Sequence, residues 1–589
     1  MADDDALEQA RERYRREREK RLRDDGLAQY SQLAGDYEEF DRDPWVEPGF
    51  TRDAVVEDVD VVILGAGYGG MFNAIGLLRR GVTSFRMVEK AGDFGGTWYW
   101  NRYPGCMCDV ESYIYMPFLE ETGYVPTQKY APATEIFEHC QRVARHFDLY
   151  PHALFQTEIQ SAEWDEATSR WHIVTSRDDH LRARFFITAS GIMHKAKLPA
   201  IEGIGDYAGH AFHTARWDYA YTGGGPTEPM DRLADKRVGI IGTGATSIQL
   251  VPQLARAAKE VYVFQRTPSA VGVRANSPTD REWFASLEPG WQRERTLNFT
   301  SAVTGEQPDV DMVGDGWTDV LWVDTQSEAA TPERAAELEQ IDFETMESMR
   351  ARIDDVIDDP ELAAKLKPWY GKHCKRICFH DEYLQAFNQP NVHLVDTDGR
   401  GVRQIVAEGP VVDGVTYPVD MLVYASGFEV TTGAVSRLGF DPVGRDGVRL
   451  SERWADGAHT LHGILTAGFP NLFICHFVQA GFGLNFAHYL GDLAAHVSTV
   501  VAGLLDEGVD TIEATPEAEE EWLATLWEAG KAFGRYSATC TPSYGNSEGA
   551  RTMVAARNVV YPGNLMGYMG HLQRWREAGG YEGTVVTRR

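Results

Sequence analysis

The residues with the clearest chemical meaning are the glycines of two short turns. The first turn reads GAGYGG at residues 65–70, directly after an apolar run and directly before a helical pattern. In such a turn Gly65 permits the tight bend, Gly67 lets the backbone approach a pyrophosphate, and Gly70 lets the helix pack close to the strand. The N-terminus of the helix then faces the anion. The turn therefore predicts a dinucleotide site.

Glu89 indicates which dinucleotide this first site accepts. It lies 19 residues after Gly70, at the end of the strand predicted for residues 84–89. A carboxylate at that point accepts hydrogen bonds from a ribose diol and repels a 2′-phosphate. The first site is therefore predicted to bind FAD or NAD, and not NADP.

A second turn, GTGATS at residues 242–247, also follows an apolar strand and precedes a helical pattern. After the second strand of this unit, Arg266 stands where an acidic residue would serve NAD. A guanidinium binds a 2′-phosphate through paired hydrogen bonds, so this site is predicted to bind NADPH. The predicted contacts are Gly242, Thr243, Gly244, Ala245, Thr246, Ser247, Arg266 and Thr267.

The segment YAGHAFHTARWD, residues 207–218, lies between the two turns. Its residues alone could form a turn with two buried core side chains. The segment closely resembles the fingerprint F-x-G-x-x-x-H-x-x-x-W-(P/D) of the Baeyer–Villiger monooxygenases, with Tyr207 in place of Phe. That family uses FAD, NADPH and O2 to insert oxygen beside a ketone, which implies the same activity and cofactors here. The motif residues are Gly209, His213, Trp217 and Asp218.

In the family this fingerprint lies on the linker between two nucleotide-binding domains. The resemblance implies that it couples NADPH binding to domain motion. His213 is therefore predicted to be a hydrogen-bonded hinge residue more than a proton-transfer catalyst.

The loop GGTWYWNRYPG, residues 95–105, is dense in glycine and aromatic residues. Glycine allows close approach to a ring, and indole and phenol edges donate hydrogen bonds, although a core loop could have the same composition. The loop resembles the flavin-embracing segment of the family. Met107 departs from the family pattern, because many members have Arg there, so no role of that arginine transfers to this chain. The implied flavin contacts are Thr97, Trp98, Trp100, Asp109 and Tyr115.

Lys375 and Arg376 match the basic pair of the family, although by spacing alone such a pair is usually solvated surface. The resemblance implies that Arg376 is the catalytic cation, that Asp109 orients it, and that Lys375 adds charge near the NADPH phosphate. The family's flavin peroxide must stay anionic to attack a ketone. A guanidinium cannot lose its proton, and one such preorganised donor contributes about 3 kcal/mol.

Residues 111–124, 137–142 and 540–549 resemble a particular subgroup of the family. With the long N-terminal extension, they are similar to the enzymes that act on macrocyclic or polycyclic ketones. The substrate is therefore predicted to be bulky and apolar.

The order of these patterns predicts an α/β fold with two Rossmann-like dinucleotide-binding domains, a helical insertion and an N-terminal helical extension. The strand pattern of residues 420–428 echoes that of residues 185–191, which predicts that the chain has returned to the first domain there. The predicted boundaries are 1–57 for the extension, 58–200 for the first part of the FAD domain, 201–384 for the NADP domain with its insertion at about 275–367, 385–540 for the second part of the FAD domain, and 541–589 for a C-terminal segment.

The bulk composition excludes several classes of partner. With 57 basic and 88 acidic residues the net charge is −31, which disfavours nucleic acid and anionic membranes. No apolar run reaches about 18 residues, and the 17 histidines show no metal-ligand spacing. The seven cysteines suggest no disulfide framework, and Cys106, Cys108, Cys374 and Cys378 are interpreted as structural. We expect a cytoplasmic enzyme without metal or evident protein partner.

Other flavoproteins provide alternative interpretations. An N- or S-hydroxylating monooxygenase shares both nucleotide folds, but its linker usually lacks Trp217 and Asp218, and it has no need of Arg376. A disulfide reductase would require a redox cysteine pair, which these spacings do not provide. A non-catalytic flavin-binding redox sensor would hold FAD without any ketone-stimulated oxidation of NADPH.

Overall fold

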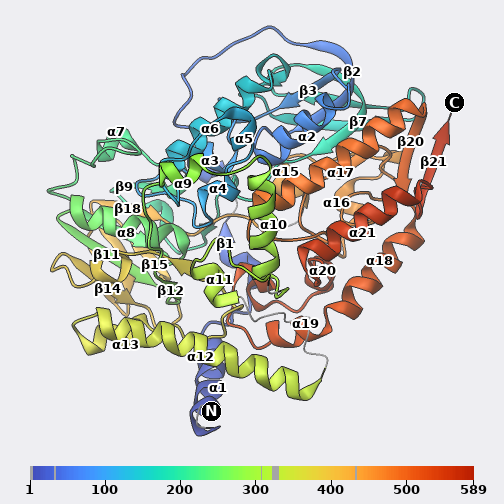
Figure 1. The fold of residues 1–589 in the computed structure, drawn as a ribbon. Helices are drawn as coiled ribbons and strands as arrows, with labels where there is room; N and C mark the ends of the chain where they lie inside the picture. The colour runs from blue at the N-terminus through green and yellow to red at the C-terminus, as the bar shows by residue number, and fades with distance from the viewer. Residues whose placement is uncertain are drawn as a thin grey trace.

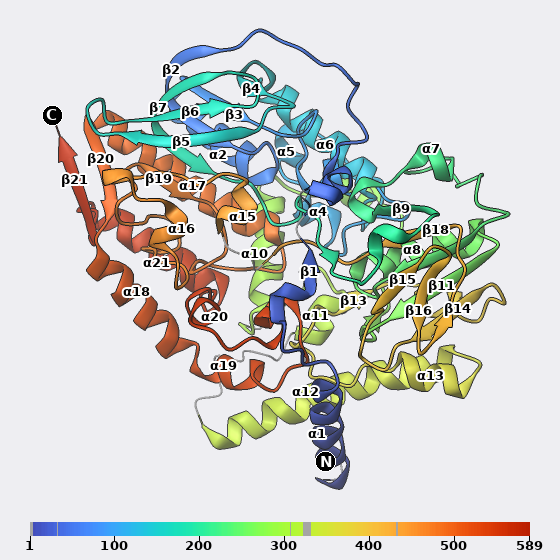
Figure 2. The ribbon, with the colours of Figure 1, turned by 180° about the vertical axis from the view of Figure 1, so that it is seen from behind.

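The computed structural model describes the chain except residues 1–3, 32, 34, 307, 322–330, 431–433 and 589. It is a mixed α/β protein, which confirms the predicted fold class at that level. Two main sheets lie beside each other, with helices on their faces (Figures 1 and 2).

The first sheet is built around strand β2, Val56–Leu64, and has the order β4–β3–β2–β7–β6–β5, with β19 also paired to β7. Strand β2 pairs in parallel with β3 and β7, whereas β6 pairs antiparallel with both β5 and β7. The middle of β2 is fully buried because both faces of the sheet are covered. The other strands are β3 Phe85–Val88, β4 Ala153–Leu154, β5 Ile159–Asp165, β6 Arg170–Thr175, β7 His180–Thr188 and β19 Leu472–Ile474.

Helix α2, Tyr68–Leu78, begins at the first glycine turn and packs along α17, Phe486–Asp506 (Figure 1). The two helices cross closely at Gly76, where a Cβ atom would lie 2.4 Å from the Ser498 Oγ atom. A larger residue at this position would separate the helices. The crossing therefore fixes the helix whose N-terminus points at the predicted cofactor.

The second sheet is wholly parallel, in the order β14–β11–β10–β18–β9. Helix α8, Ala245–Ala257, follows β10 directly after the second glycine turn. The strands are β9 His210–His213, β10 Arg237–Ile241, β11 Glu260–Gln265, β14 Val392–Asp396 and β18 Met421–Tyr424.

The position of β18 corrects one prediction. Residues 420–428 were expected to return the chain to the first domain, but β18 pairs with β10, at the centre of the second sheet. The chain rejoins the first sheet only at β19. Both segments are short apolar strands that end in small residues, and this pattern does not specify which sheet a strand enters.

Helices fill the range where an insertion was predicted. The longest is α12, Pro332–Val356, which lies against α1, Asp4–Glu19, at the same end of the molecule (Figure 1). The Arg11 Nε atom donates to the Glu339 Oε1 atom at 2.7 Å, so the extension packs on the insertion. The others are α9 Arg281–Ala285, α10 Trp291–Val303, α11 Gly316–Leu321 and α13 Pro360–Leu366.

Shorter elements and the C-terminal helices complete the described chain. They are β1 Tyr30–Ser31, paired with β8 Leu198–Pro199, α3 Thr97–Trp100, α4 Ser112–Tyr115, α5 Leu119–Thr122, α6 Ala133–His146, α7 Tyr219–Thr222, β12 Val271–Gly272, β13 Cys378–Phe379, α14 Tyr383–Ala386, β15 Gln404–Val406, β16 Gly409–Val412, β17 Val415–Thr416, α15 Ala434–Leu438, α16 Leu450–Arg453, β20 Val509–Ala514, α18 Pro516–Ala529, α19 Lys531–Ser537, α20 Met553–Arg557, α21 Leu565–Ala578 and β21 Thr584–Arg588.

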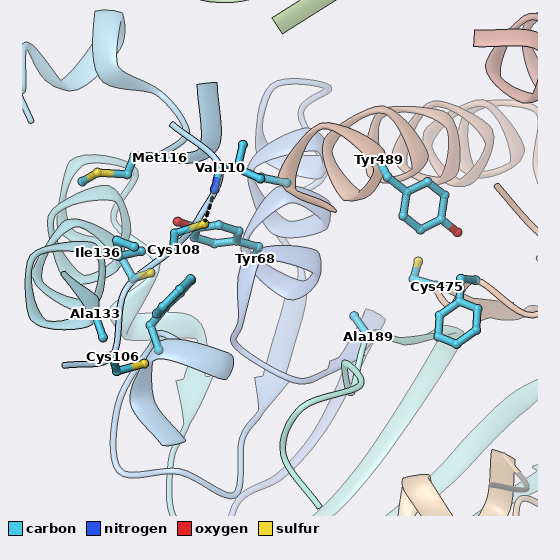
Figure 3. Close-up of a cluster of buried hydrophobic side chains, with 14 of the residues drawn as sticks. Tyr68, Cys106, Cys108, Val110, Met116, Ala133, Ile136, Ala189, Cys475 and Tyr489 are labelled. Carbon is cyan, nitrogen blue, oxygen red and sulfur yellow. Dashed lines mark hydrogen bonds between the residues drawn. The ribbon is translucent and has the colours of Figure 1, made fainter. Parts of the chain in front are cut away.

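The cysteines divide into two groups. Cys106 and Cys108 are free and buried in the apolar cluster around Tyr68 (Figure 3), as a structural role requires. Cys374, however, forms a disulfide with Cys540, 166 residues further along the chain. This corrects the expectation that no disulfide is present. The spacing of the two cysteines could not indicate the bond, because the fold brings together segments that are distant in the sequence.

Candidate functional site

The two glycine turns open onto one cavity of about 1560 Å³. Most of the predicted site residues line this cavity, including Arg376 and Asp109. Six do not. Two of these, Gly70 and Ser247, lie in the first turns of their helices, and the other four are the fingerprint residues. These six are Gly70, Gly209, His213, Trp217, Asp218 and Ser247.

The first turn is shaped by atoms that leave no room for side chains. A Cβ atom at Gly70 would lie 1.9 Å from the Gly65 carbonyl oxygen, and one at Gly65, where φ is +102°, would lie 2.5 Å from the Ala189 carbonyl oxygen. Gly67 precedes α2, so the free N–H groups of that helix face the cavity. This cradle fits the pyrophosphate of a dinucleotide.

Glu89 holds the same turn from the next strand. Its Oε2 atom accepts from the Ala66 N–H group at 2.7 Å, and its Oε1 atom accepts from the Ala91 N–H group at 2.7 Å. Burial raises the pKa of this carboxyl group. Glu89 lines the cavity, where its carboxylate can also accept from a ribose diol.

The aromatic loop packs directly on the first turn. A Cβ atom at Gly96 would lie 2.7 Å from the Gly67 Cα atom, so these glycines allow the two backbones to touch. The loop continues into α3, which places Thr97, Trp98 and Trp100 on the cavity wall. The ring of Tyr115 contacts Trp98 edge to face, at 5.6 Å between centroids.

The second turn repeats this arrangement in the second sheet. At Gly242 φ is +119°, and a Cβ atom would lie 2.4 Å from the Ala425 carbonyl oxygen. Ser247 fills the third glycine position, and its hydroxyl donates to the Gly242 carbonyl oxygen at 2.8 Å. The Thr243 hydroxyl donates to the Thr267 carbonyl oxygen at 2.6 Å, which joins the turn to the end of β11.

Arg376 and Asp109 form an ion pair on the cavity wall. The Arg376 Nη2 atom donates to the Asp109 Oδ1 atom at 2.7 Å, and the Trp317 indole N–H donates to the Asp109 carbonyl oxygen at 2.8 Å. Although burial alone would lower it, the pKa of Arg376 is raised by the charge of Asp109. The guanidinium therefore stays charged beside the cavity.

Lys375 lies next to this pair but in a different electrostatic environment. Its Nζ atom donates to the Pro542 carbonyl oxygen at 3.0 Å. Burial, together with the charge of Arg266, lowers the pKa of Lys375 to about 7. The Lys375 side chain is therefore partly a neutral amine near pH 7, and it would take up a proton when an anion binds beside it.

The fingerprint residues make structural contacts outside the cavity. His213 ends strand β9, is fully buried, and its Nδ1 atom accepts from the Ala215 N–H group at 3.1 Å. Trp217 is also fully buried and donates to the Thr222 hydroxyl at 3.1 Å. The Asp218 carboxylate accepts from the Tyr221 N–H group and so caps α7. At Gly209 only glycine fits, because a Cβ atom would lie 2.3 Å from the Tyr207 hydroxyl oxygen.

Arg216 lies within the fingerprint segment, at a position that the motif leaves unspecified, and its side chain reaches the cavity. Its guanidinium lies 3.9 Å from the centroid of the Trp100 ring and donates to the Asp41 Oδ1 atom at 2.8 Å. It therefore joins the fingerprint to the aromatic loop and to the N-terminal extension. The sequence contained one indication of this contact, because Arg216 is a basic residue within a segment rich in aromatic residues.

Gln249 is a second residue that the sequence did not indicate. It lies on α8, accepts from the Tyr103 hydroxyl at 2.8 Å, and donates to the Met107 carbonyl oxygen at 2.8 Å. The helix of the second glycine turn is thereby bonded to the loop of the first. Many family members have Arg in place of Met107. In this chain the Arg274 guanidinium donates to the Met107 Sδ atom at 3.4 Å, so an arginine from another part of the chain lies beside Met107.

A third unpredicted group surrounds Arg266. Its guanidinium donates to the Gln29 Oε1 atom at 2.7 Å and to the Glu548 Oε2 atom at 3.3 Å. Neither residue lies near Arg266 in the sequence, so the group depends entirely on tertiary contacts.

Over the described residues, no three His, Cys, Asp or Glu side chains gather in a way that could hold a metal ion. None of the helices in the described part of the chain combines the length and apolar character needed to cross a membrane.

Comparison with known proteins supplies a family context for this geometry. Residues 58–279 match the model of the flavin-binding monooxygenase-like family. The neopentalenolactone D synthase of Streptomyces avermitilis is 46% identical, covering 97% of this chain and 98% of its own. A Baeyer–Villiger monooxygenase of Streptomyces coelicolor is 45% identical, covering 97% and 96%.

A solved structure agrees over nearly the full length. The polycyclic ketone monooxygenase of Thermothelomyces thermophila superposes with a TM-score of 0.92 at 40% identity. The match covers 99% of each chain. The N-terminal extension and the C-terminal segment are therefore included in the likeness.

The environment of His213 predicts how stability depends on pH. Burial lowers its pKa to about 3 from an ordinary value of 6.5. Its contribution to stability is therefore complete above pH 6.5 and is lost as the pH falls toward 3, by about 1.4 kcal/mol per pH unit. We expect His213→Asn, which cannot protonate, to be less stable than wild type at pH 7.5, with the gap narrowing by about 2 kcal/mol at pH 5.

Chemical unfolding at pH 7.5, 6 and 5 measures this gap. His146→Asn, at an exposed position, is the control and should show a gap that does not change with pH. A gap for His213→Asn that stays constant would mean that folding does not change the pKa of His213.

Proposed function

Since the chain belongs to the Baeyer–Villiger monooxygenases, we propose that it uses FAD, NADPH and O2 to convert bulky cyclic or polycyclic ketones into lactones or esters. One observation carries this proposal: two dinucleotide cradles open onto the same cavity as an arginine held by a carboxylate at 2.7 Å. Two cofactors and one fixed cation are the parts that this reaction requires.

FAD is assigned to the first cradle. Gly65, Gly67 and the N-terminus of α2 would hold its pyrophosphate, and Glu89 would accept hydrogen bonds from its ribose. The aromatic loop with Trp98 and Trp100 would then contact the flavin ring. When bound, the reduced flavin supplies the electrons that activate O2.

NADPH is assigned to the second cradle. Gly242, Gly244 and the N-terminus of α8 would hold its pyrophosphate. Arg266 and Lys375 both line the cavity and lie close enough that, in addition to burial, the charge of Arg266 lowers the pKa of Lys375, so both would contact the 2′-phosphate. The lowered pKa of Lys375 fits this role, because a nearby phosphate would restore its positive charge.

Arg376 is proposed as the catalytic cation. Its guanidinium lines the cavity, and Asp109 fixes its direction without neutralising it. Negative charge develops on oxygen when a nucleophile adds to a ketone carbonyl, and a cation already in place stabilises that charge without reorganisation. Asp109 acts on the reaction through Arg376 and is a positioning residue.

The fingerprint is proposed to be a mechanical coupling. His213 and Trp217 are buried next to β9 and make short-range hydrogen bonds, whereas Arg216 extends from the same segment to the aromatic loop. Movement of the second sheet when NADPH binds would therefore be transmitted to the flavin contacts.

The size and lining of the cavity support a bulky, apolar substrate. Beyond the cradles, its wall includes Phe477, Phe482, Phe533 and Val560 from the C-terminal part of the chain. Burial of apolar surface stabilises a bound ketone by about 25 cal/mol per Å². A large polycyclic ring would gain more from this wall than a small ring would.

The domain boundaries are proposed in revised form. The FAD domain would comprise residues 58–200 together with the chain from about residue 430 onward. The NADP domain would extend from residue 201 through β18, with the helices of residues 281–366 inserted in it. With these boundaries, each glycine turn lies in the same domain as the sheet that it follows.

The first test replaces the proposed catalytic cation. Arg376→Ala should retain FAD and should still be reduced by NADPH, because neither cradle contains its side chain. Product formation should fall by about 100-fold, with hydrogen peroxide released in its place. NADPH oxidation, peroxide and lactone are measured together in one reaction.

Arg293→Ala is the matched control, because it also breaks an arginine–aspartate pair, at 2.9 Å to Asp492, but away from the cavity. It should form lactone at the wild-type rate. Lactone formation retained by Arg376→Ala would assign the catalytic charge to another residue.

The second test uses the pH dependence of coenzyme affinity. Lys375 has a pKa of about 7 in the free protein, and a 2′-phosphate would raise it. Affinity is therefore highest below pH 7 and should weaken by up to about tenfold per unit as the pH rises above 7. The phosphate itself is already a dianion in this range, since its second pKa is about 6.

Titration of NADP⁺ between pH 7 and 9 measures the slope. Lys375→Arg keeps its charge at every pH in that range and should flatten the dependence. A slope of the same size in both proteins would show that some other group takes up the proton.

A further inference from the structure

Three basic side chains converge beside the second glycine turn. Lys197, Arg266 and Lys375 all line this part of the cavity, and Lys197 is only 5% exposed. Positive charges removed from water are costly unless an anion lies beside them. The protein must therefore provide a negative charge at this place whenever no coenzyme does.

Glu548 provides that charge. Its side chain is almost fully buried, and its Oε2 atom accepts from the Arg266 Nη2 atom at 3.3 Å. Its Oε1 atom accepts from the Tyr30 hydroxyl at 3.1 Å and lies 3.7 Å from the Lys197 Nζ atom. Although burial alone would raise it, the pKa of Glu548 is lowered by the charges of Arg266 and Lys197, so the group is a carboxylate.

We propose that Glu548 is an internal anion that occupies the 2′-phosphate subsite and is displaced when NADPH binds. This inference rests on the proposed NADPH site, because Arg266 is the residue assigned to the phosphate. A phosphate brings nearly two negative charges and three acceptor oxygens, so it can replace one carboxylate. The 2′-hydroxyl of NADH brings no charge and cannot.

The backbone around Glu548 suits such a displacement. The residue lies in an irregular turn, Tyr544–Gly549, in which Ser547, Glu548 and Gly549 all have positive φ angles. Tyr544–Gly549 form only a short, kinked 3-10 helix, so no α-helix or sheet has to break when this turn moves. The chain before it is fixed, because Cys540 is bonded to Cys374 and the Ser543 hydroxyl donates to the Cys374 carbonyl oxygen at 3.1 Å.

The N-terminal extension belongs to the same network. Gln29 accepts from the other side of the Arg266 guanidinium at 2.7 Å, and Tyr30 holds Glu548. The Arg21 Nε atom donates to the Thr267 hydroxyl at 3.0 Å. The extension therefore sets how firmly Glu548 is held, which gives this segment a role in coenzyme affinity.

The proposal predicts the sign of a binding change. A competing anion weakens the binding of any ligand that carries a 2′-phosphate, because the ligand must first displace it. Removal of the charge should therefore tighten binding only of ligands that carry a 2′-phosphate. A residue that merely shaped the pocket would weaken binding when it is changed.

The test titrates adenosine 2′,5′-bisphosphate and 5′-AMP into the FAD-loaded protein by calorimetry. We expect Glu548→Gln to bind the bisphosphate about tenfold more tightly than wild type, with 5′-AMP changed by less than about twofold. Glu513→Gln is the control, because its carboxylate also accepts from an arginine, Arg445, but lies outside the cavity. It should change neither affinity.

Tyr30→Phe is a second variant that keeps the carboxylate and removes one of its hydrogen bonds. It should tighten bisphosphate binding by a smaller factor, about two- to threefold. Weaker or unchanged bisphosphate binding in Glu548→Gln, or in Tyr30→Phe if Glu548→Gln does not fold, would overturn the inference. Failure of the wild-type protein to distinguish the bisphosphate from 5′-AMP would instead overturn the NADPH assignment.

Discussion

The pairing of Arg376 with Asp109 is the interaction on which the site depends. The aspartate follows the aromatic loop of the first cradle, and the arginine follows the helical insertion, so the pair forms only when both parts are assembled. The ion pair holds the partly exposed guanidinium of Arg376 in one direction on the cavity wall. Trp317, from the insertion, holds the backbone of Asp109 and completes this arrangement. The position of the proposed catalytic charge is therefore set by three distant segments at once.

A small number of polar side chains connects the two cradles. Gln249 bonds the helix of the second cradle to the loop of the first, and Arg216 connects the fingerprint with Trp100 and with Asp41 of the extension. A coupling between the two cradles, as we propose it, would pass through side-chain contacts of this kind. The fingerprint lies at this junction, and the residues that we propose carry the chemistry, Arg376 and Asp109, lie on either side of it in the sequence.

The sequence indicated the parts that have a local physical cause. Both glycine turns, Glu89 and Arg266 could be predicted as cofactor contacts because glycine, acid and base occur at fixed distances from predicted strands, and the structure shows that they line one cavity. The role proposed for Arg376 and the class of reaction came from resemblance to a family. The partner sheet of β18, the Cys374–Cys540 bond and the contact of Glu548 with Arg266 could not be predicted. Each of these joins segments far apart in the chain, and no pattern within a segment specifies its partner.

The most direct measurement compares NADPH consumed with lactone or ester formed, for a series of cyclic ketones from small rings to polycyclic and macrocyclic ones. A Baeyer–Villiger monooxygenase with this cavity should form one product molecule for nearly every NADPH oxidised with the bulky ketones, and less product with small rings. Oxidation of NADPH without lactone or ester across the whole series would contradict the proposed activity. Bound FAD with no ketone-stimulated oxidation of NADPH would favour a redox sensor instead.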